Sequence, residues 1–202
     1  MLPDKMPDFS EWLTGERIVA EEKAWSETQH YKNNVAWINK TIQRFSLYHP
    51  SVVEMGCGSG WVPFELGDSV RYLGIDKNHD LLALCRKKNE GNSARFRQCD
   101  IREFLWPPFD IVCSFAVLKH FSLDEWPNVF LRMLRVGRFG VFQMQTTTGP
   151  SIDDGTEYHH VWVNDEIVGQ CIERAEHKIV DCIVTWNQGP LTERTIFTKR
   201  IA

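Results

Sequence analysis

The sequence lacks a long apolar run, a marked excess of either charge and any paired-cysteine motif. Its 202 residues carry 23 Lys and Arg against 27 Asp and Glu, a formal net charge of −4. Such a balance gives no general attraction to nucleic acid or to an anionic membrane surface. No apolar run reaches the length of a membrane span, and the opening MLPDKMPDFSEW lacks the apolar core of a signal peptide. The sequence therefore predicts a cytoplasmic protein with neither a membrane nor a nucleic acid as its partner.

The six cysteines do not include a C-x-x-C pair, so their spacing does not indicate a zinc site, and no metal is expected. Several fall in apolar segments, where free cysteine behaves as a small buried hydrophobe. With 43% hydrophobic and 25% charged residues, the composition is that of one soluble domain with a well-buried core.

The most informative segment is SVVEMGCGSG, residues 51–60. It predicts a short apolar strand that ends in an acid and a turn in which Gly56, Gly58 and Gly60 recur at alternate positions. Such a turn lets the backbone come within contact distance of a ligand, with N–H groups facing it. The dinucleotide fingerprint would need a glycine where Trp61 stands, and no G-K-[ST] of a phosphate loop follows. NAD, FAD and a P-loop nucleotide are therefore disfavoured.

Two more acids close apolar runs further along the chain. Asp76 ends VRYLGID and Asp100 ends ARFRQCD. An acid at the end of the second strand of an open α/β sheet can bind the ribose hydroxyls of a nucleoside. Each acid alone fits a helix cap equally well. Together with Glu54 they lie in order on one predicted sheet edge, which favours a ligand site.

Strands and helices alternate after residue 50. Strands are predicted at 51–55, 70–75, 95–99, 109–115 and 138–145, with helices between them at 61–67, 78–90, 101–105 and 124–136. A polar loop is predicted over 146–160, followed by a helix that begins at Asn164 and by two strands, 177–186 and 191–200. This alternation predicts the α/β class, with a doubly wound, mostly parallel sheet and helices on both faces.

The turn Glu54–Gly60, followed by Asp76 and Asp100, resembles the motifs of the class I S-adenosylmethionine-dependent methyltransferases. The resemblance covers roughly residues 50–200. It implies a Rossmann-like, seven-stranded sheet with an antiparallel last strand, in one domain over 50–202. It also implies S-adenosylmethionine as cofactor, with Asp76 on the ribose and Asp100 on the adenine amino group. The implied cofactor-binding residues are Glu54, Gly56, Cys57, Gly58, Gly60, Asp76, Lys77, Asp100, Ile101, Ser114 and Phe115.

Residues 1–49 are expected to form a tail and a helical lid. From residue 10 to residue 48 apolar side chains recur at helical spacing, and many are aromatic. In the family, the segment before the first strand commonly covers the cofactor. Trp25, Tyr31 and Trp37 are therefore candidates for an aromatic lid that excludes water.

Methyl transfer from a sulfonium is an in-line displacement with a neutral leaving group. Holding the reactants in line supplies much of the catalysis, and a base is needed only where the acceptor loses a proton. His120 follows the fourth predicted strand, a place where small-molecule relatives often have a histidine. His159 lies in the loop expected to overhang the acceptor. Both are candidate catalytic residues, although surface or capping histidines fit the same pattern.

The resemblance implies a small-molecule acceptor that is methylated on oxygen, nitrogen or carbon. No Asn/Asp-Pro-Pro-Tyr follows the fourth strand, and no Pro-Cys nucleophile is present there. These absences argue against methylation of the adenine or glutamine amino group and of cytosine carbon. A methyltransferase of protein or RNA, and a cofactor-binding relative without catalysis, stay open as alternatives. The oligomeric state and the acceptor are not specified by the sequence.

Overall fold

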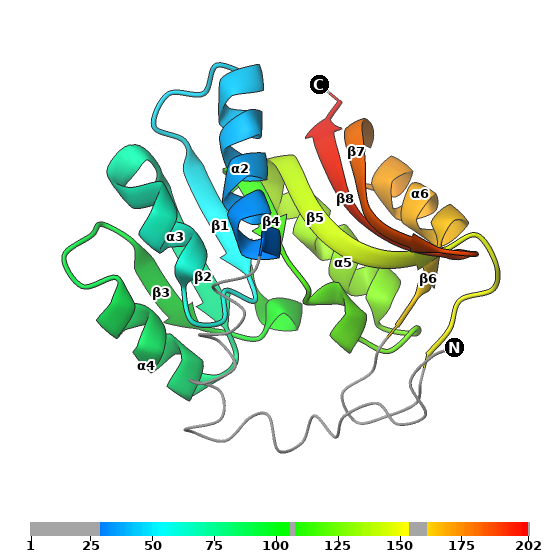
Figure 1. The fold of residues 1–202 in the computed structure, drawn as a ribbon, viewed down its shortest axis with the longest axis horizontal. Coiled ribbons are helices and arrows are strands. Elements are labelled where there is room, and N and C mark those ends of the chain that lie inside the picture. The colour runs from blue at the N-terminus through cyan, green and yellow to red at the C-terminus, as the bar shows by residue number, and fades with distance from the viewer. Residues whose placement is uncertain (1–28, 106–107, 154–160, 202) are drawn as a thin grey trace.

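A computed structural model describes residues 29–105, 108–153 and 161–201. The strands form one sheet in the order β3-β2-β1-β4-β5-β8-β7, and β6 pairs with β5 as the eighth strand (Figure 1). The strands are β1 Ser51–Met55, β2 Arg71–Asp76, β3 Arg95–Gln98, β4 Phe109–Ser114, β5 Gly137–Thr147, β6 Val163–Asn164, β7 His177–Gln188 and β8 Leu191–Arg200. The α-helices are α2 Gln29–Arg44, α3 Trp61–Leu66, α4 His79–Lys88, α5 Trp126–Val136 and α6 Asp165–Arg174. Short 3-10 turns are η2 Gly67–Ser69, η3 Ile101–Glu103 and η4 Leu118–His120.

The pairing confirms the predicted mostly parallel topology, but the sheet has eight strands where seven were predicted, because the short β6 pairs with β5. β1 lies between β2 and β4 and is parallel to both, and β4 is parallel to β5. β8 is antiparallel to both of its neighbours, β5 and β7. The carboxyl ends of β1, β2 and β4 therefore lie at one edge of the sheet, where ligands of such sheets collect.

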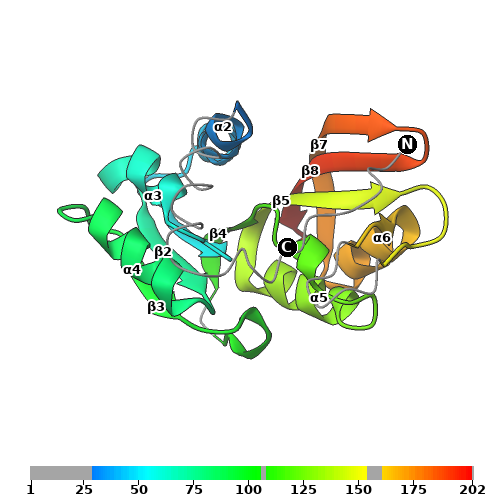
Figure 2. The same cartoon turned by 60° about the horizontal axis from the view of Figure 1, so that its bottom comes forward.

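Helices cover both faces of the sheet (Figure 2). One core cluster joins Val53 and Met55 of β1 to buried side chains of α5 and α6. A second joins Val52 to Trp37 and Ile38 of α2 and to α3. Successive residues of a strand point to opposite faces, so the apolar run of β1 supplies both clusters. This burial on both sides fixes the strand that carries the glycine turn.

Asparagine side chains begin two of the helices. Asn78 Oδ1 accepts the backbone N–H groups of Asp80 and Leu81 at 2.9 and 3.1 Å at the start of α4. Asn164 Oδ1 accepts that of Glu166 at 2.7 Å at the start of α6, which confirms the predicted N-cap.

Two predicted segments differ in the structure. The predicted helix 101–105 is only the 3-10 turn η3, because Phe104 already has extended backbone angles and a buried side chain. The predicted loop 146–160 begins later, since β5 continues to Thr147, which pairs with Leu191 of β8. The polar composition from residue 146 onward suggested an end of the strand at 145, but antiparallel pairing with β8 extends it by two residues. Part of that loop, 154–160, lies outside the described residues.

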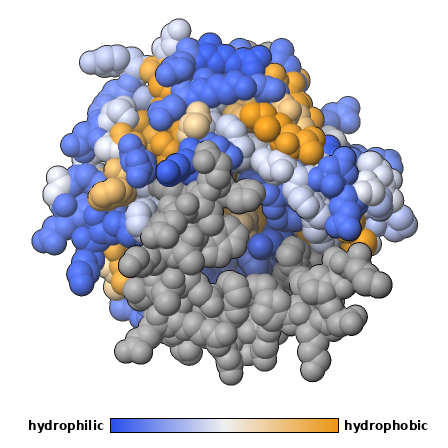
Figure 3. All heavy atoms as spheres, viewed as in Figure 1, coloured by the Kyte–Doolittle hydropathy of each residue, from blue (hydrophilic) through white to orange (hydrophobic). Residues whose placement is uncertain are grey.

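The face seen in Figure 3 is largely hydrophilic, with hydrophobic patches between polar areas. Within the described residues, no helix has both the length and the apolar character that crossing a membrane requires.

Candidate functional site

The glycines after β1 adopt backbone conformations that other residues rarely take. The φ angles of Gly56, Gly58 and Gly60 are 78°, 52° and 72°. A Cβ atom on Gly56 would lie 2.3 Å from Cγ2 of Val117, and one on Gly60 would lie 2.8 Å from Sγ of Cys85. The conformation therefore favours glycine at all three positions, and close packing requires it at Gly56 and Gly60.

Hydrogen bonds tie this turn to the end of β2. Gly56 N and Cys57 N both donate to the carbonyl oxygen of Ile75, at 2.8 and 3.0 Å. Gly58 N donates to Oδ2 of Asp76 at 3.0 Å. These amides were expected to face a ligand, but in the structure they hold the turn in place. A ligand can approach the turn closely because its glycines have no Cβ atom.

Asp76 joins the second strand end to the turn. Its Oδ1 accepts the backbone N–H of Asn78 at 2.9 Å, while Oδ2 takes that of Gly58. Burial raises the pKa of Asp76, and the two backbone hydrogen bonds oppose that rise. Each carboxylate oxygen has a second lone pair, so Asp76 keeps the capacity to accept hydrogen bonds from a ligand. Lys77, the next residue, is exposed.

Glu54 lies beneath the turn and is 4% exposed. Burial raises its pKa to about 8, although a hydrogen bond donated by the Tyr72 hydroxyl partly opposes the shift. Glu54 is therefore mainly an uncharged carboxylic acid at neutral pH. Tyr72 was not found from the sequence. Its contact with Glu54 depends on the β1–β2 register, in which Glu54 lies opposite Gly74, two residues after Tyr72.

The Cys57 side chain turns inward from the glycine turn. Its Sγ lies 4.0 Å from Sγ of Cys85, and Cys85 Sγ donates to the Gly58 carbonyl oxygen at 2.8 Å. The contact with Cys85 and burial both raise the pKa of Cys57, so it remains a thiol. Any contact of Cys57 with a ligand is therefore through its backbone.

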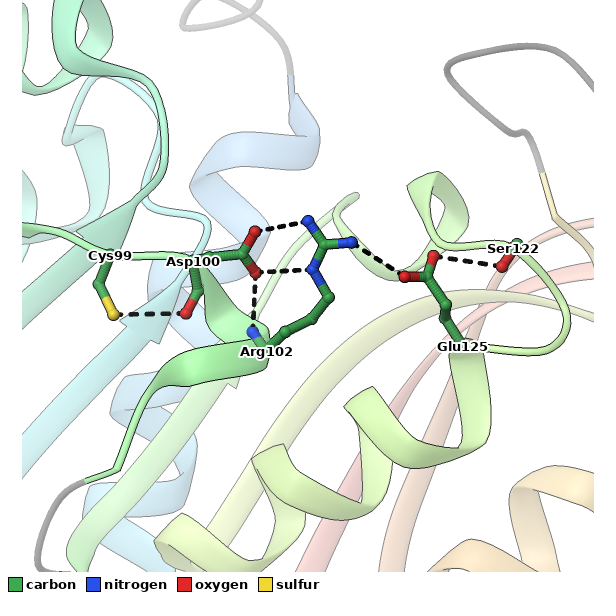
Figure 4. Close-up of polar contacts among 5 residues, drawn as sticks. All are labelled: Cys99, Asp100, Arg102, Ser122 and Glu125. Atoms are coloured by element: carbon green, nitrogen blue, oxygen red, sulfur yellow. Dashed lines mark hydrogen bonds and ion pairs between the residues drawn. The ribbon is translucent and has the colours of Figure 1, made fainter.

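Asp100 is bound by an arginine two residues away (Figure 4). Its Oδ1 accepts hydrogen bonds from N and Nε of Arg102 at 2.8 and 3.0 Å, and its Oδ2 accepts one from Nη2 at 2.6 Å. Nη1 of Arg102 reaches Oε1 of Glu125 at 2.9 Å. The hydrogen bond from the Arg102 side chain lowers the pKa of Asp100. Asp100 thus caps η3 and forms an ion pair with Arg102. This pairing was not predicted from the sequence, and it would compete with a ligand for the carboxylate of Asp100.

Replacing Arg102 with Met is expected to tighten binding of S-adenosylhomocysteine by up to about fivefold. The Arg102 and Asp100 side chains are 49% and 23% exposed, and pairs of this kind contribute about 0–1 kcal/mol. The resemblance implies that Asp100 binds the adenine amino group, which would have to overcome this free energy to displace Arg102. Calorimetric titration of the variant measures this change. Arg95→Met, an exposed arginine of β3, is the matched control. Weaker binding of S-adenosylhomocysteine by the Arg102 variant would show that Arg102 does not compete with the cofactor for Asp100. Arg102 would then be a cofactor contact itself.

Three other predicted cofactor residues are buried. Ser114 Oγ donates to the carbonyl oxygen of Met55 at 2.9 Å and so links the ends of β4 and β1. The Phe115 ring lies 6.5 Å from that of Trp37, centroid to centroid. Ile101 is 7% exposed and belongs to the core beside α5. These three side chains pack inside the protein, beneath the carboxyl ends of the strands.

The candidate base His120 is the last residue of η4 and is exposed. Its backbone N–H donates to the carbonyl oxygen of Val117 at 3.0 Å. His159 and Trp25 lie outside the described residues, as does the side chain of Tyr31. The described part of the chain contains no group of three side chains able to hold a metal ion.

The segment that contains the glycine turn and the three acids was compared with known protein families. Residues 52–140 match the family model described as a methyltransferase domain. This segment is similar to that methyltransferase domain. It contains the glycine turn, all three acids, and the four strands whose ends form the site. No curated protein sequence matches the chain.

Solved methyltransferases share the fold across nearly the whole chain. Magnesium protoporphyrin IX methyltransferase from Synechocystis PCC 6803, with bound S-adenosylmethionine, is 16% identical with a TM-score of 0.71, over 96% of this chain and 91% of its own. A methyltransferase from Clostridium acetobutylicum is 11% identical with a TM-score of 0.72, over 92% and 97%. The 1,6-didemethyltoxoflavin-N1-methyltransferase of Burkholderia thailandensis is 15% identical with a TM-score of 0.66, over 100% and 93%. At these identities the likeness shows the fold.

Proposed function

We propose that this methyltransferase acts on a small-molecule acceptor at the carboxyl edge of β1, β2 and β4. The observation that carries the proposal is the bond from Gly58 N to Asp76, which joins the glycine turn and the second strand end into one ligand edge. The net charge of −4 offers no general attraction to RNA. Two structural neighbours are named for small-molecule substrates, a magnesium protoporphyrin and a didemethyltoxoflavin.

The proposed roles follow the order of the strand ends. The turn over 54–60 lies against the methionine part of the cofactor, Asp76 accepts hydrogen bonds from the ribose, and Asp100 and Ile101 bind adenine. The residues that complete the cofactor edge are Lys77, Ser114 and Phe115. When bound, S-adenosylmethionine supplies an electrophilic methyl group on a positively charged sulfur. This chain then has to align the acceptor, exclude water and, for an acceptor that carries a proton, take up that proton.

His120 is proposed as the base or positioning group, because it follows β4, beside the expected methionine end of the cofactor. His159 remains a second candidate for the same role. We also propose that residues 1–49 form a tail and a helical lid. Of the three aromatic candidates for the lid, the structure describes the side chain of Trp37, which is buried in the core and packs against Phe115, directly after β4.

Calorimetric titration with S-adenosylmethionine and S-adenosylhomocysteine tests the cofactor site. At a hundredfold excess over Kd, binding is expected to stabilise the fold by about 2.7 kcal/mol. Asp76→Ala is expected to weaken binding by roughly 1.5–3 kcal/mol, the range for hydrogen bonds to a charged group. Asp80→Ala, an exposed acid in the first turn of α4, serves as the control. Absence of both heat and thermal shift at millimolar cofactor would contradict the proposal.

Turnover against a metabolite library, detected as S-adenosylhomocysteine, tests the acceptor class. Formation of a methylated small molecule supports it. Cofactor binding without turnover of any metabolite, combined with methylation of RNA or protein from an extract, would favour the macromolecular alternative.

A further inference from the structure

β5 runs past the end of β4 and carries two buried glutamines there. β4 ends at Ser114, opposite Phe142, whereas β5 continues to Thr147. Phe142 and Met144 point into the core that α5 and α6 share. Gln143 and Gln145 alternate with them and therefore lie on the other face, the one on which α2 packs. They are 6% and 5% exposed.

These glutamines donate hydrogen bonds to a glutamate of β8, the strand that pairs with β5. In the β5–β8 register Gln145 is opposite Glu193. Glu193 Oε1 accepts hydrogen bonds from Gln143 Nε2 and Thr185 Oγ1, both at 3.0 Å, and Oε2 accepts one from Gln145 Nε2 at 2.9 Å. The carboxylate uses the N–H groups of both amides, which directs their oxygens elsewhere.

Two acceptor atoms in this cluster are buried without a hydrogen-bond partner. They are Oε1 of Gln145 and Oγ1 of Thr195, and Thr195 is fully buried opposite Gln143. Oδ1 of Asn34 is also buried and unpartnered; it belongs to the face of α2 that carries Trp37 and Ile38 onto the sheet. Buried polar atoms in native proteins nearly always have a partner, so this concentration of unsatisfied acceptors calls for a donor that a ligand can supply.

Lys119 follows β4 in η4, a turn that packs against β5. Its carbonyl oxygen accepts the backbone N–H of Val161 at 2.9 Å. Burial lowers the pKa of Lys119, and the charge of Glu193 opposes that change, which places the two side chains in the same electrostatic environment. Glu193 already accepts three hydrogen bonds within the cluster, and the two unpartnered atoms are uncharged oxygens, so the cluster favours a neutral ligand over an ion.

We propose that the cluster of Gln143, Gln145, Thr185, Glu193 and Thr195 binds the methyl acceptor and recognises its hydroxyl or N–H donors. This inference rests on the proposed function, because the cluster lies beyond the same strand ends as the cofactor edge. The acceptor class is a neutral small molecule that presents at least two hydrogen-bond donors. One donor would satisfy Gln145 Oε1 and another the oxygen of Thr195.

Probe compounds test this without knowledge of the natural acceptor. Resorcinol and urea supply donors, while resorcinol dimethyl ether and tetramethylurea have the same skeletons without them. Each is titrated at millimolar concentration into protein with and without S-adenosylhomocysteine, and the side-chain amide signals of Gln143 and Gln145 are followed by NMR. The donor compounds are expected to shift these signals, and the methylated compounds are not.

Two isosteric variants make the test specific. Thr195→Val removes the unpartnered hydroxyl without changing side-chain shape, so the melting temperature should stay equal or rise while donor-probe affinity falls about 2- to 10-fold. Thr146→Val is the matched control, because Thr146 is also buried and unpartnered but lies on the opposite face of β5. It should leave probe affinity unchanged.

Three outcomes would overturn the inference: no response to either donor probe, equal responses to donor and methylated probes, or equal losses in both threonine variants. Cofactor titration on the same samples separates the two proposals. If S-adenosylhomocysteine binds and the donor probes do not, only the acceptor-recognition inference fails. If the cofactor does not bind, the proposed function fails.

Discussion

Replacing Glu54 with Gln is expected to remove a large part of the pH dependence of the free energy of unfolding between pH 4.5 and about 8. In the folded protein burial raises the pKa of Glu54 from 4.5 to about 8. The folded state therefore keeps a proton that the unfolded state releases throughout this window. Stability from this group is fully present below pH 4.5 and is lost as the pH rises through about 8.

The expected slope for one such group is about 1.4 kcal/mol per pH unit, which gives a total on the order of a few kcal/mol across the window. Glutamine carries no titratable proton and still accepts the hydrogen bond of Tyr72. The free energy of unfolding of the variant should therefore rise relative to that of wild type as the pH rises. Urea unfolding at a series of pH values measures this difference. Glu65→Gln, an exposed position in α3, is the control. Parallel curves for wild type and Glu54→Gln would show that Glu54 is ionised in the folded protein.

Much of the fold could be predicted because its signals are local. The apolar runs, the glycines after β1 and the Asn164 cap each act within a few residues of the chain. The same holds for the three acids, whose place at strand ends follows from where the apolar runs stop. The predicted end of β5, residue 145, was two residues too early, because Thr146 and Thr147 begin a polar stretch with the composition of a loop and only their pairing with β8 makes them part of the strand.

The partners of the site residues could not be predicted, because they depend on register and side-chain direction. Tyr72 meets Glu54 only through the alignment of β1 with β2. Arg102 is close to Asp100 in sequence, but the choice between an arginine and a ligand is made by the geometry of η3. The glutamines of β5 and Glu193 are about fifty residues apart and meet only when β8 returns beside β5.

Replacing His120 with Ala is expected to lower turnover of the confirmed acceptor by about 10²–10⁴-fold, the usual loss of a working general base. The reason is positional. The transferable methyl should point toward the segments that follow β1 and β4, and His120 ends the turn η4 after β4. Affinity for S-adenosylhomocysteine should stay nearly constant, because the cofactor edge is formed by the turn 54–60 and by Asp76. Calorimetry and steady-state rates on the same protein measure both quantities.

The control for this experiment is His49→Asn. His49 is exposed, lies before β1 at the opposite edge of the sheet and has a positive φ of 46°, which asparagine tolerates. A loss confined to kcat at position 120 assigns His120 to the proton transfer. A loss confined to KM makes it a residue that positions the acceptor. Turnover within about threefold of wild type would leave His120 without either role, and holding the acceptor in line with the methyl group would then have to account for the rate.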